Sequence, residues 1–285
     1  MVVEPWLLLA LFLALFAGAA ALAWFIWYRR KRVVEIPRRR SAQLRYPVVL
    51  AHGILGFDEL KLGPIRSKYF RGVGSRLEKL GTRVYSFKVH PTATVSARAA
   101  ELARALELLD AERVNIVAHS MGGLDARYAA SKLAVGGRIA SIITVGTPHR
   151  GTPLADMGSG LWLVAPATRM LLDKGGFDAH GLLELTTERM KRFNEEVLDQ
   201  PGIFYGSWLA KATFRGLNPL LFPTWQLLRL KAGENDGLVP VTSQSWGVTC
   251  GRIDADHWAQ VGWALGFDAP EFYESVVTDL IERGL

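Results

Sequence analysis

Cysteine is nearly absent from the chain: Cys250 is the only one in 285 residues. A single cysteine excludes an intrachain disulfide, and it agrees with a reducing compartment. No basic side chain adjoins Cys250 in "WGVTCG". We therefore expect a small core residue rather than a nucleophile.

Charge is absent from the 24 residues Pro5 to Tyr28, which are mostly Leu, Ala, Phe and Trp. As a helix this run would be about 36 Å long, enough to cross a hydrocarbon core of about 30 Å. Trp24, Trp27 and Tyr28 stand where an interfacial aromatic belt would lie. Residues 1–32 are thus predicted to be a single-pass transmembrane anchor with a basic flank, and residues 33–45 a linker.

Two other interpretations of the apolar run are open. A cleaved signal peptide could have its processing site in "AGAAALA", but the segment before the run, "MVVE", has no basic side chain, and the cluster Arg29–Arg32 follows the run. A buried core helix would need a polar face, which this run lacks. Both features favour the uncleaved anchor.

Basic residues are concentrated next to the apolar run. Residues 1–40 hold seven Lys and Arg and two Glu, which leaves 27 basic and 25 acidic residues in the rest of the chain. This near-equal number of basic and acidic residues gives no reason to expect a nucleic-acid partner. Because basic flanks stay on the cytoplasmic side, the large domain is predicted to lie in the cytoplasm.

No internal repeat is visible, and strand and helix patterns alternate from residue 46 to 285. Strands are predicted at Val48–Ala51, Arg83–Val89, Val114–Ala118 and Ile139–Val145. Helices are predicted after a Ser96 cap, with Leu102, Leu106 and Leu109 on one face, and from Ser120 to about Leu133. Continuous apolar strands separated by helices indicate an α/β fold with a mostly parallel sheet covered on both faces.

The alternation is interrupted between about residues 152 and 230. Stretches such as "GLWLVAPATRMLLDKGG" place Trp, Phe and Pro among glycines, with a helix predicted at Thr187–Leu198 and a strand at Ile203–Trp208. A cap or lid insertion over one end of the sheet fits this pattern, and ordinary core helices are the alternative.

The stretch "NIVAHSMGGLDARY" sets the predicted strand directly against Ser120. A strand–turn–helix of this type holds a serine hydroxyl above the sheet, and small residues such as Ala118 and Gly122 let strand and helix approach. The N–H of Met121, at the helix start, can donate to an oxyanion. A second donor is predicted at Ile54 in "VVLAHGILGFDEL", with His52 bracing that loop.

A serine nucleophile needs a histidine base, and the chain has six histidines. In enzymes with such a turn the acid and then the base follow the serine. His52 and His90 precede Ser120, and His119 lies in the turn itself. His149 is expected to fix a loop and His180 falls in the presumed cap, which leaves His257 as the predicted base.

The predicted acid is Asp236 in "AGENDGLVP", 21 residues before His257. A carboxylate there would select the imidazole tautomer and stabilise the imidazolium. A plain Asp-Gly turn is the alternative. Asp254 and Asp256 are rivals, but they are so close to His257 in the chain that they would have to bend back onto its ring.

From about Pro47 onward the chain resembles α/β-hydrolases of the bacterial triacylglycerol lipase group. The matching stretches occur in family order: "VVLAHGILGFD", "VNIVAHSMGGLDARY", "ITVGTPHRGTPLAD", "LTTERMKRFN" and "ENDGLVP". This resemblance implies Ser120, Asp236 and His257 as nucleophile, acid and base, with Ile54 and Met121 as oxyanion donors. An Ala at the first turn position is also met among small lipases of that superfamily.

Two departures from secreted relatives affect the expected cofactors. Those relatives commonly bind calcium through an Asp two residues after the catalytic histidine, where this chain has Ala259, and many carry a disulfide. We therefore expect no calcium and no other cofactor. Both changes fit a membrane-tethered intracellular enzyme.

The predicted function is hydrolysis of carboxylic esters, with lipid esters favoured by the anchor and by the apolar residues Leu161–Val164 of the presumed cap. An acyltransferase or thioesterase would use the same triad. A membrane-tethered binding protein on a hydrolase fold is the alternative from a different class.

Overall fold

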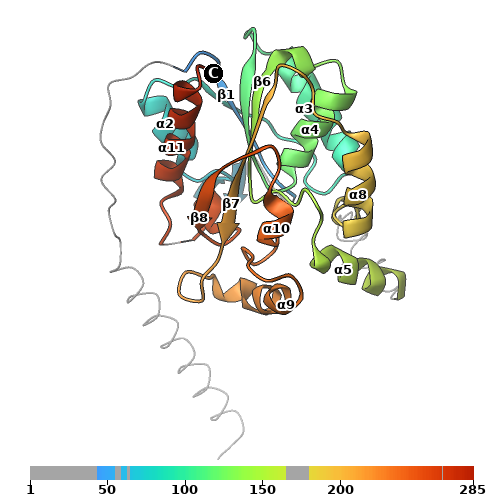
Figure 1. The fold of residues 1–285 in the computed structure, drawn as a ribbon. Coiled ribbons are helices and arrows are strands. Elements are labelled where there is room, and N and C mark those ends of the chain that lie inside the picture. The colour runs from blue at the N-terminus through green and yellow to red at the C-terminus, as the bar shows by residue number, and fades with distance from the viewer. Residues whose placement is uncertain (1–43, 55–58, 63–64, 165–179, 265) are drawn as a thin grey trace, which may run out of the picture.

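A parallel sheet of six strands forms the centre of the protein, which is described here from a computed structural model (Figure 1). The structure describes residues 44–54, 59–62, 65–164, 180–264 and 266–285. The strand order is β4-β1-β5-β6-β7-β8, and every neighbouring pair is parallel. The strands are β1 (Val48–Ala51), β4 (Val84–Ser86), β5 (Val114–His119), β6 (Ile139–Val145), β7 (Phe204–Lys211) and β8 (Val248–Asp254).

Helices cover both faces of this sheet. On one side lie α3 (Val95–Glu107) and α4 (Gly122–Lys132), and on the other lie α2 (Val73–Lys79) and α11 (Ala269–Glu282), as Figure 1 shows. The central strands are apolar on both faces for this reason: Val49 packs toward α3 and α4, whereas Val48 packs toward α2 and α11. The predicted α/β architecture with a mostly parallel sheet is confirmed.

The remaining elements gather near the ends of the strands. A small antiparallel pair, β2 (Glu59–Leu62) and β3 (Ile65–Lys68), follows β1. Helices α5 (Pro153–Val164), α7 (His180–Glu184) and α8 (Thr187–Glu196) lie between β6 and β7. The segment after β7 holds η2 (Pro219–Leu221), α9 (Phe222–Ala232) and α10 (Val241–Gln244), while η1 (Gly136–Arg138) precedes β6 and η3 (Ala259–Val261) follows β8.

Strand β7 divides the 152–230 region into two segments. Because β7 pairs with both β6 and β8, it belongs to the main sheet. The first segment contains α5, α7 and α8, and the second contains α9. The side chains of Leu161–Val164 lie outside the described residues.

Three local predictions from the sequence are wrong. The cap of α3 is Thr94, whose side chain accepts from the Ala97 N–H, and not Ser96. Strand β4 covers only Val84–Ser86, because it is an edge strand that pairs with β1 alone. Cys250 lies half-buried on the edge strand β8 rather than in the core. Burial raises the pKa of its thiol, which disfavours the nucleophilic thiolate.

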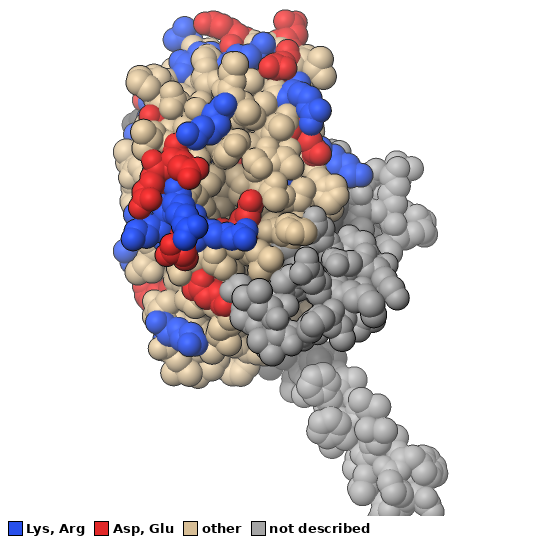
Figure 2. Space-filling model, turned by 90° about the vertical axis from the view of Figure 1, so that its right-hand side faces the viewer, with Lys and Arg blue, Asp and Glu red and all other residues tan. Residues whose placement is uncertain are grey.

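The surface of the domain mixes charges of both signs. On the face in Figure 2, Lys and Arg side chains alternate with Asp and Glu side chains. In the part of the chain that the structure describes, no helix is long and apolar enough to cross a membrane. The predicted anchor, residues 1–32, lies outside the described residues, as does nearly all of the predicted linker.

Candidate active site

The candidate site is built where the central strands end. Ser120 directly follows β5 and has φ 56°, the only positive φ at a non-glycine residue among the described residues. This left-handed conformation is strained for a residue with a Cβ, and such strain is typical of a serine held on a tight strand-to-helix turn. The turn is fixed from both sides, because Ser120 N–H donates to Val145 O at 3.0 Å and Thr147 Oγ1 donates to Ser120 O at 2.7 Å.

Glycines allow the chain to close around Ser120. A Cβ on Gly122 would fall 2.6 Å from Ala51 O, so α4 could not approach the end of β1 with any larger residue there. A Cβ on Gly53 would fall 2.6 Å from Ser120 Cβ. The loop after β1 therefore lies directly against the serine.

The two predicted oxyanion donors flank this contact. Ile54 follows Gly53 and is half-buried, and Met121 is fully buried at the start of α4. The N-terminus of a helix carries free N–H groups and a partial positive charge, which suit an oxygen that gains negative charge.

Asp236 and His257 are brought together by two hydrogen bonds. His257 Nδ1–H donates to Asp236 Oδ2 at 2.8 Å, and His257 N–H donates to Asp236 O at 2.8 Å. Asp236 is fully buried, and Leu238 N–H and Val239 N–H donate to its other oxygen. These bonds fix the orientation of the buried carboxylate, with Oδ2 directed at the His257 ring.

The rival acids are placed elsewhere. Both Asp256 oxygens accept backbone N–H groups, from Trp258 and Ala259 on one side and from Asn218 on the other. This carboxylate thus holds the loop that carries His257, and burial raises its pKa. Asp254 is exposed at the end of β8.

The other histidines have structural contacts. His52 Nδ1–H donates to Gly53 O at 2.9 Å and its Nε2 accepts from Val89 N–H, so it braces the loop as expected. His149 lies 3.1 Å from Thr144 Oγ1 and stacks on Trp246. His90 and His180 are exposed.

His119 links the serine turn to the histidine loop. Its ring centroid is 4.5 Å from that of His257, and its Nδ1 lies 2.7 Å from the Tyr69 hydroxyl. Burial, together with His257, lowers the pKa of His119 well below its usual value. The structure thus favours a neutral His119 ring beside His257.

Comparison with known proteins identifies the family. Residues 27–203 match the model of a domain of unknown function, DUF7379. A Vibrio cholerae triacylglycerol lipase is 31% identical over 241 residues, 72% of this chain and 75% of the relative, and triacylglycerol lipase 2 of Saccharomyces cerevisiae is 28% identical over 76% of this chain and 80% of the relative. The chain belongs to the bacterial triacylglycerol lipase-like family of carboxylic ester hydrolases.

Solved structures of lipases and esterases have the same fold. The mature Bacillus licheniformis lipase BlEst2 superposes with a TM-score of 0.64 at 22% identity, over 86% of this chain and 96% of that protein. A metagenomic carboxyl esterase superposes with a TM-score of 0.71 at 19% identity, over 88% of this chain and 79% of that protein. The α/β-hydrolase fold of this lipase-family chain is therefore shared across both groups.

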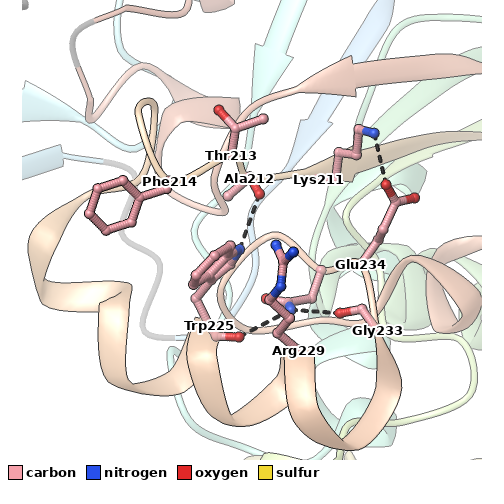
Figure 3. A pocket seen from close by; sticks show the side chains of 9 residues that line it. Lys211, Ala212, Thr213, Phe214, Trp225, Arg229, Gly233 and Glu234 are labelled. Carbon is pink, nitrogen blue, oxygen red and sulfur yellow. Dashed lines mark hydrogen bonds and ion pairs between the residues drawn. The ribbon is translucent and has the colours of Figure 1, made fainter.

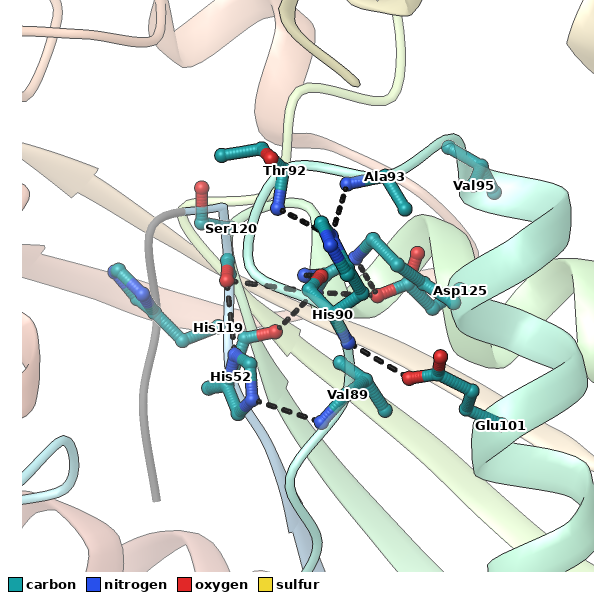
Figure 4. A network of polar contacts seen from close by, with 12 residues as sticks. His52, Val89, His90, Thr92, Ala93, Val95, Glu101, His119, Ser120 and Asp125 are labelled. Atoms are coloured by element: carbon teal, nitrogen blue, oxygen red, sulfur yellow. Dashed lines mark hydrogen bonds and ion pairs between the residues drawn. The ribbon is translucent and has the colours of Figure 1, made fainter. Parts of the chain in front are cut away.

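Two residues beside the site of this lipase-family protein were not predicted from its sequence. Gln260 Nε2–H donates to Asp236 Oδ2 at 2.9 Å, the oxygen that also accepts from His257. Arg98 is fully buried and donates to His52 O at 2.7 Å and Gly53 O at 3.4 Å, so it holds the loop that leads to Ile54. Figure 4 shows the network around this loop, with Ser120 beside His52.

Arg98 also joins this loop to helix α4, which follows Ser120. Its guanidinium forms an ion pair with Asp125 of α4 at 2.7 Å, and both side chains are almost completely buried. Burial raises the pKa of Asp125 to about 6, although Arg98 opposes the shift. A charged residue among the apolar positions of α3, between Val95 and Leu102, was the available signal in the sequence.

Proposed function

We propose that this protein is a membrane-anchored serine hydrolase that cleaves carboxylic esters of lipids. His257 removes the proton of Ser120, the serine attacks the acyl carbonyl, and the N–H groups of Ile54 and Met121 stabilise the oxyanion. Asp236 holds the imidazole in the tautomer that accepts this proton and stabilises its charged form. Water activated by His257 then releases the acid from the acyl-enzyme.

The observation that carries the proposal is the buried hydrogen bond between His257 and Asp236, at the same end of the sheet as the strained Ser120. An oriented imidazole and a serine on a sharp turn are the two parts that acyl transfer requires. The similar proteins are named triacylglycerol lipases and a carboxyl esterase, which supports a carboxylic ester as the substrate.

The test compares the full chain with Ser120→Ala in detergent micelles. A fluorophosphonate probe labels only an activated serine, so we expect labelling of the wild type and none of the variant. Hydrolysis of p-nitrophenyl esters of graded acyl length should be lost with the labelling, and release of the free acid identifies water as the acceptor. Equal labelling of both proteins would refute the assignment of the nucleophile.

The acid is tested separately by Asp236→Asn. An amide at this position keeps the shape but favours the wrong tautomer, which costs about 10⁴-fold in kcat in a serine protease triad. Asp254→Asn is the matched control and should retain activity, because Asp254 is exposed at the end of β8.

The membrane assignment is a proposal from the sequence: residues 5–28 span the bilayer and the catalytic domain faces the cytoplasm. Protease treatment of intact cells should leave the domain undigested, whereas treatment of lysed cells should digest it. Digestion in intact cells would overturn the orientation.

A further inference from the structure

Large apolar side chains are exposed on the segment between β7 and Asp236. We call four of these residues the apolar rim: Phe214, Leu220, Phe222 and Leu230. Phe214, Leu220 and Leu230 are 70%, 76% and 78% exposed. Phe222 packs edge-on against Phe214, with ring centroids 6.0 Å apart. Four of the ten exposed large hydrophobic residues of the described chain thus fall within 17 positions, a concentration typical of an interaction surface.

A cavity of about 410 Å³ opens beside the apolar rim, between the end of β7 and α9 (Figure 3). Phe214 and the buried Trp225 supply its apolar wall. The Trp225 ring is fixed, because its Nε1–H donates to Ala212 O at 3.1 Å, and the guanidinium of Arg229 lies 5.2 Å from the ring centroid.

The charged groups of this cavity have an excess of cations. The carboxylate of Glu234 is shared by Lys211 Nζ at 2.8 Å and the Arg252 guanidinium at 3.9 Å. Arg229 also lines the cavity and makes no ion pair with any residue that the structure describes. Two cations, Lys211 and Arg229, and one carboxylate, Glu234, thus line the cavity, and this excess of one positive charge favours an anionic ligand.

The neighbouring sequence strengthens this bias. Residues 211–234 contain four basic residues, among them Arg215 and Lys231, and a single acidic residue, Glu234. Exposed apolar side chains within a basic surface match a phospholipid layer, where acyl chains lie directly beneath anionic phosphates.

This surface lies at the catalytic end of the molecule. Helix α9 lies at the end of the sheet to which the strands point, as Ser120 does, and it packs against α5 (Figure 1). Asn235, which lines the cavity, immediately precedes Asp236. A bilayer on the apolar rim would thus be at the end of the sheet where the proposed ester hydrolysis occurs.

We infer that the apolar rim and its cavity dock the protein on an anionic phospholipid bilayer. The rim side chains enter the acyl layer, and the cavity receives a headgroup phosphate between Arg229 and Lys211. The apolar rim belongs to residues 214–230, in a different part of the sequence from the predicted anchor, and it determines how the domain faces the membrane.

The test uses the full chain in liposomes of phosphatidylcholine, with and without 30% phosphatidylglycerol. Leu220→Cys in a Cys250→Ala background carries a solvent-sensitive fluorophore. We expect a blue shift and quenching by spin-labelled lipid on the anionic liposomes only. Leu108→Cys is the matched control, since Leu108 is 88% exposed at the end of α3, and its label should remain in water on both liposomes.

The cavity cations are tested in the same assay. Arg229→Gln or Lys211→Gln should lower the ratio of docked to undocked protein about fivefold each. Arg104→Gln, which removes an exposed arginine on α3, should leave the ratio unchanged. All three variants should retain hydrolysis of a water-soluble p-nitrophenyl ester, so that failure of docking is distinguished from failure of the proposed ester hydrolysis.

Three results would overturn the inference. The label at position 220 could remain in water on anionic liposomes, or it could shift equally on neutral ones. A blue shift in dilute detergent before any bilayer is present would show that another part of the chain, or a second copy, covers the apolar rim.

Discussion

Replacement of Arg98 should separate stability from catalysis in this protein. In Arg98→Met the carboxylate of Asp125 loses its ion pair at 2.7 Å, and the carbonyl oxygens of His52 and His90 each lose a donor at 2.7 Å. Asp125 and His52 are buried, so water does not readily replace the contacts that they lose.

The expected loss of stability follows from this burial. Removal of one partner of a buried ion pair costs about 3–5 kcal/mol. For a domain of this size each kcal/mol lowers the Tm by about 2–4 °C, so we expect a fall of about 10 °C. Arg76→Met is the matched control: its pair with Glu274 is on the surface, and its loss should cost less than about 1 kcal/mol.

A double variant then tests the catalytic role. Arg98→Met with Asp125→Leu removes both charges, and a buried pair replaced by apolar residues is often neutral or stabilising. The Tm should therefore recover. Because His52 O and Gly53 O still lack their donor, the loop that leads to Ile54 should remain misplaced, and kcat for a soluble ester should remain about 100-fold low.

Thermal unfolding and ester hydrolysis measured on the same preparations decide the matter. If kcat recovers together with the Tm in the double variant, Arg98 acts only on stability, and the argument that it positions the oxyanion loop is refuted. If Arg98→Met alone lowers the free energy of unfolding by less than about 1 kcal/mol, the argument from burial of the ion pair is refuted.

Three further predictions concern the same end of the sheet. Gly53→Ala should lower kcat about 100-fold and also lower the Tm, because the new Cβ would fall 2.6 Å from Ser120 Cβ and would force the loop or the turn to shift; an unchanged kcat would contradict this contact. Gln260→Leu removes a donor to Asp236 Oδ2, and we expect kcat to fall about tenfold while KM for a soluble ester is unchanged; a change confined to KM would speak against a positioning role. Burial lowers the pKa of His149 below its usual value, so the folded state disfavours its protonation and stability should decrease as the pH falls below about 6.5, by up to about 1.4 kcal/mol per pH unit. In urea unfolding from pH 7.5 to 5, the free energy of unfolding of His149→Gln should decrease less steeply with falling pH than that of the wild type. Equal slopes would contradict the attribution of this pH dependence to His149.

The sequence predicted elements best where both faces of a strand are buried. Strand β6, Ile139–Val145, has the predicted bounds because all seven residues are buried, so its apolar run has no gap. The start of α3 was misplaced because Thr94 and Ser96 are both good caps. Val95 decides between them: it is buried in a cluster with Met121 and Leu124, which requires the helix to begin before Ser96.

The three residues of the candidate site could be predicted from chain order and local pattern, since Ser120, Asp236 and His257 each lie in a recognisable turn. The residues that support them could not be predicted in this way. Gln260 contacts a residue 24 positions away and Arg98 contacts residues 27 and 46 positions away. No local periodicity encodes such pairings, which follow only from the packing of α3 and η3 at the strand ends.

Buried polar groups near the strand ends connect the segments of the candidate site to one another. Arg98, Asp125 and His119 are almost completely removed from water, which disfavours folding unless each is bonded. Arg98 bonds both to the loop before Ile54 and to Asp125 on the helix after Ser120, so a displacement of these segments would leave buried groups without hydrogen bonds. The same contacts that are costly to bury therefore restrict the serine turn and the loop of the predicted oxyanion donor Ile54 to one relative position, which is the preorganisation that the proposed acyl transfer requires.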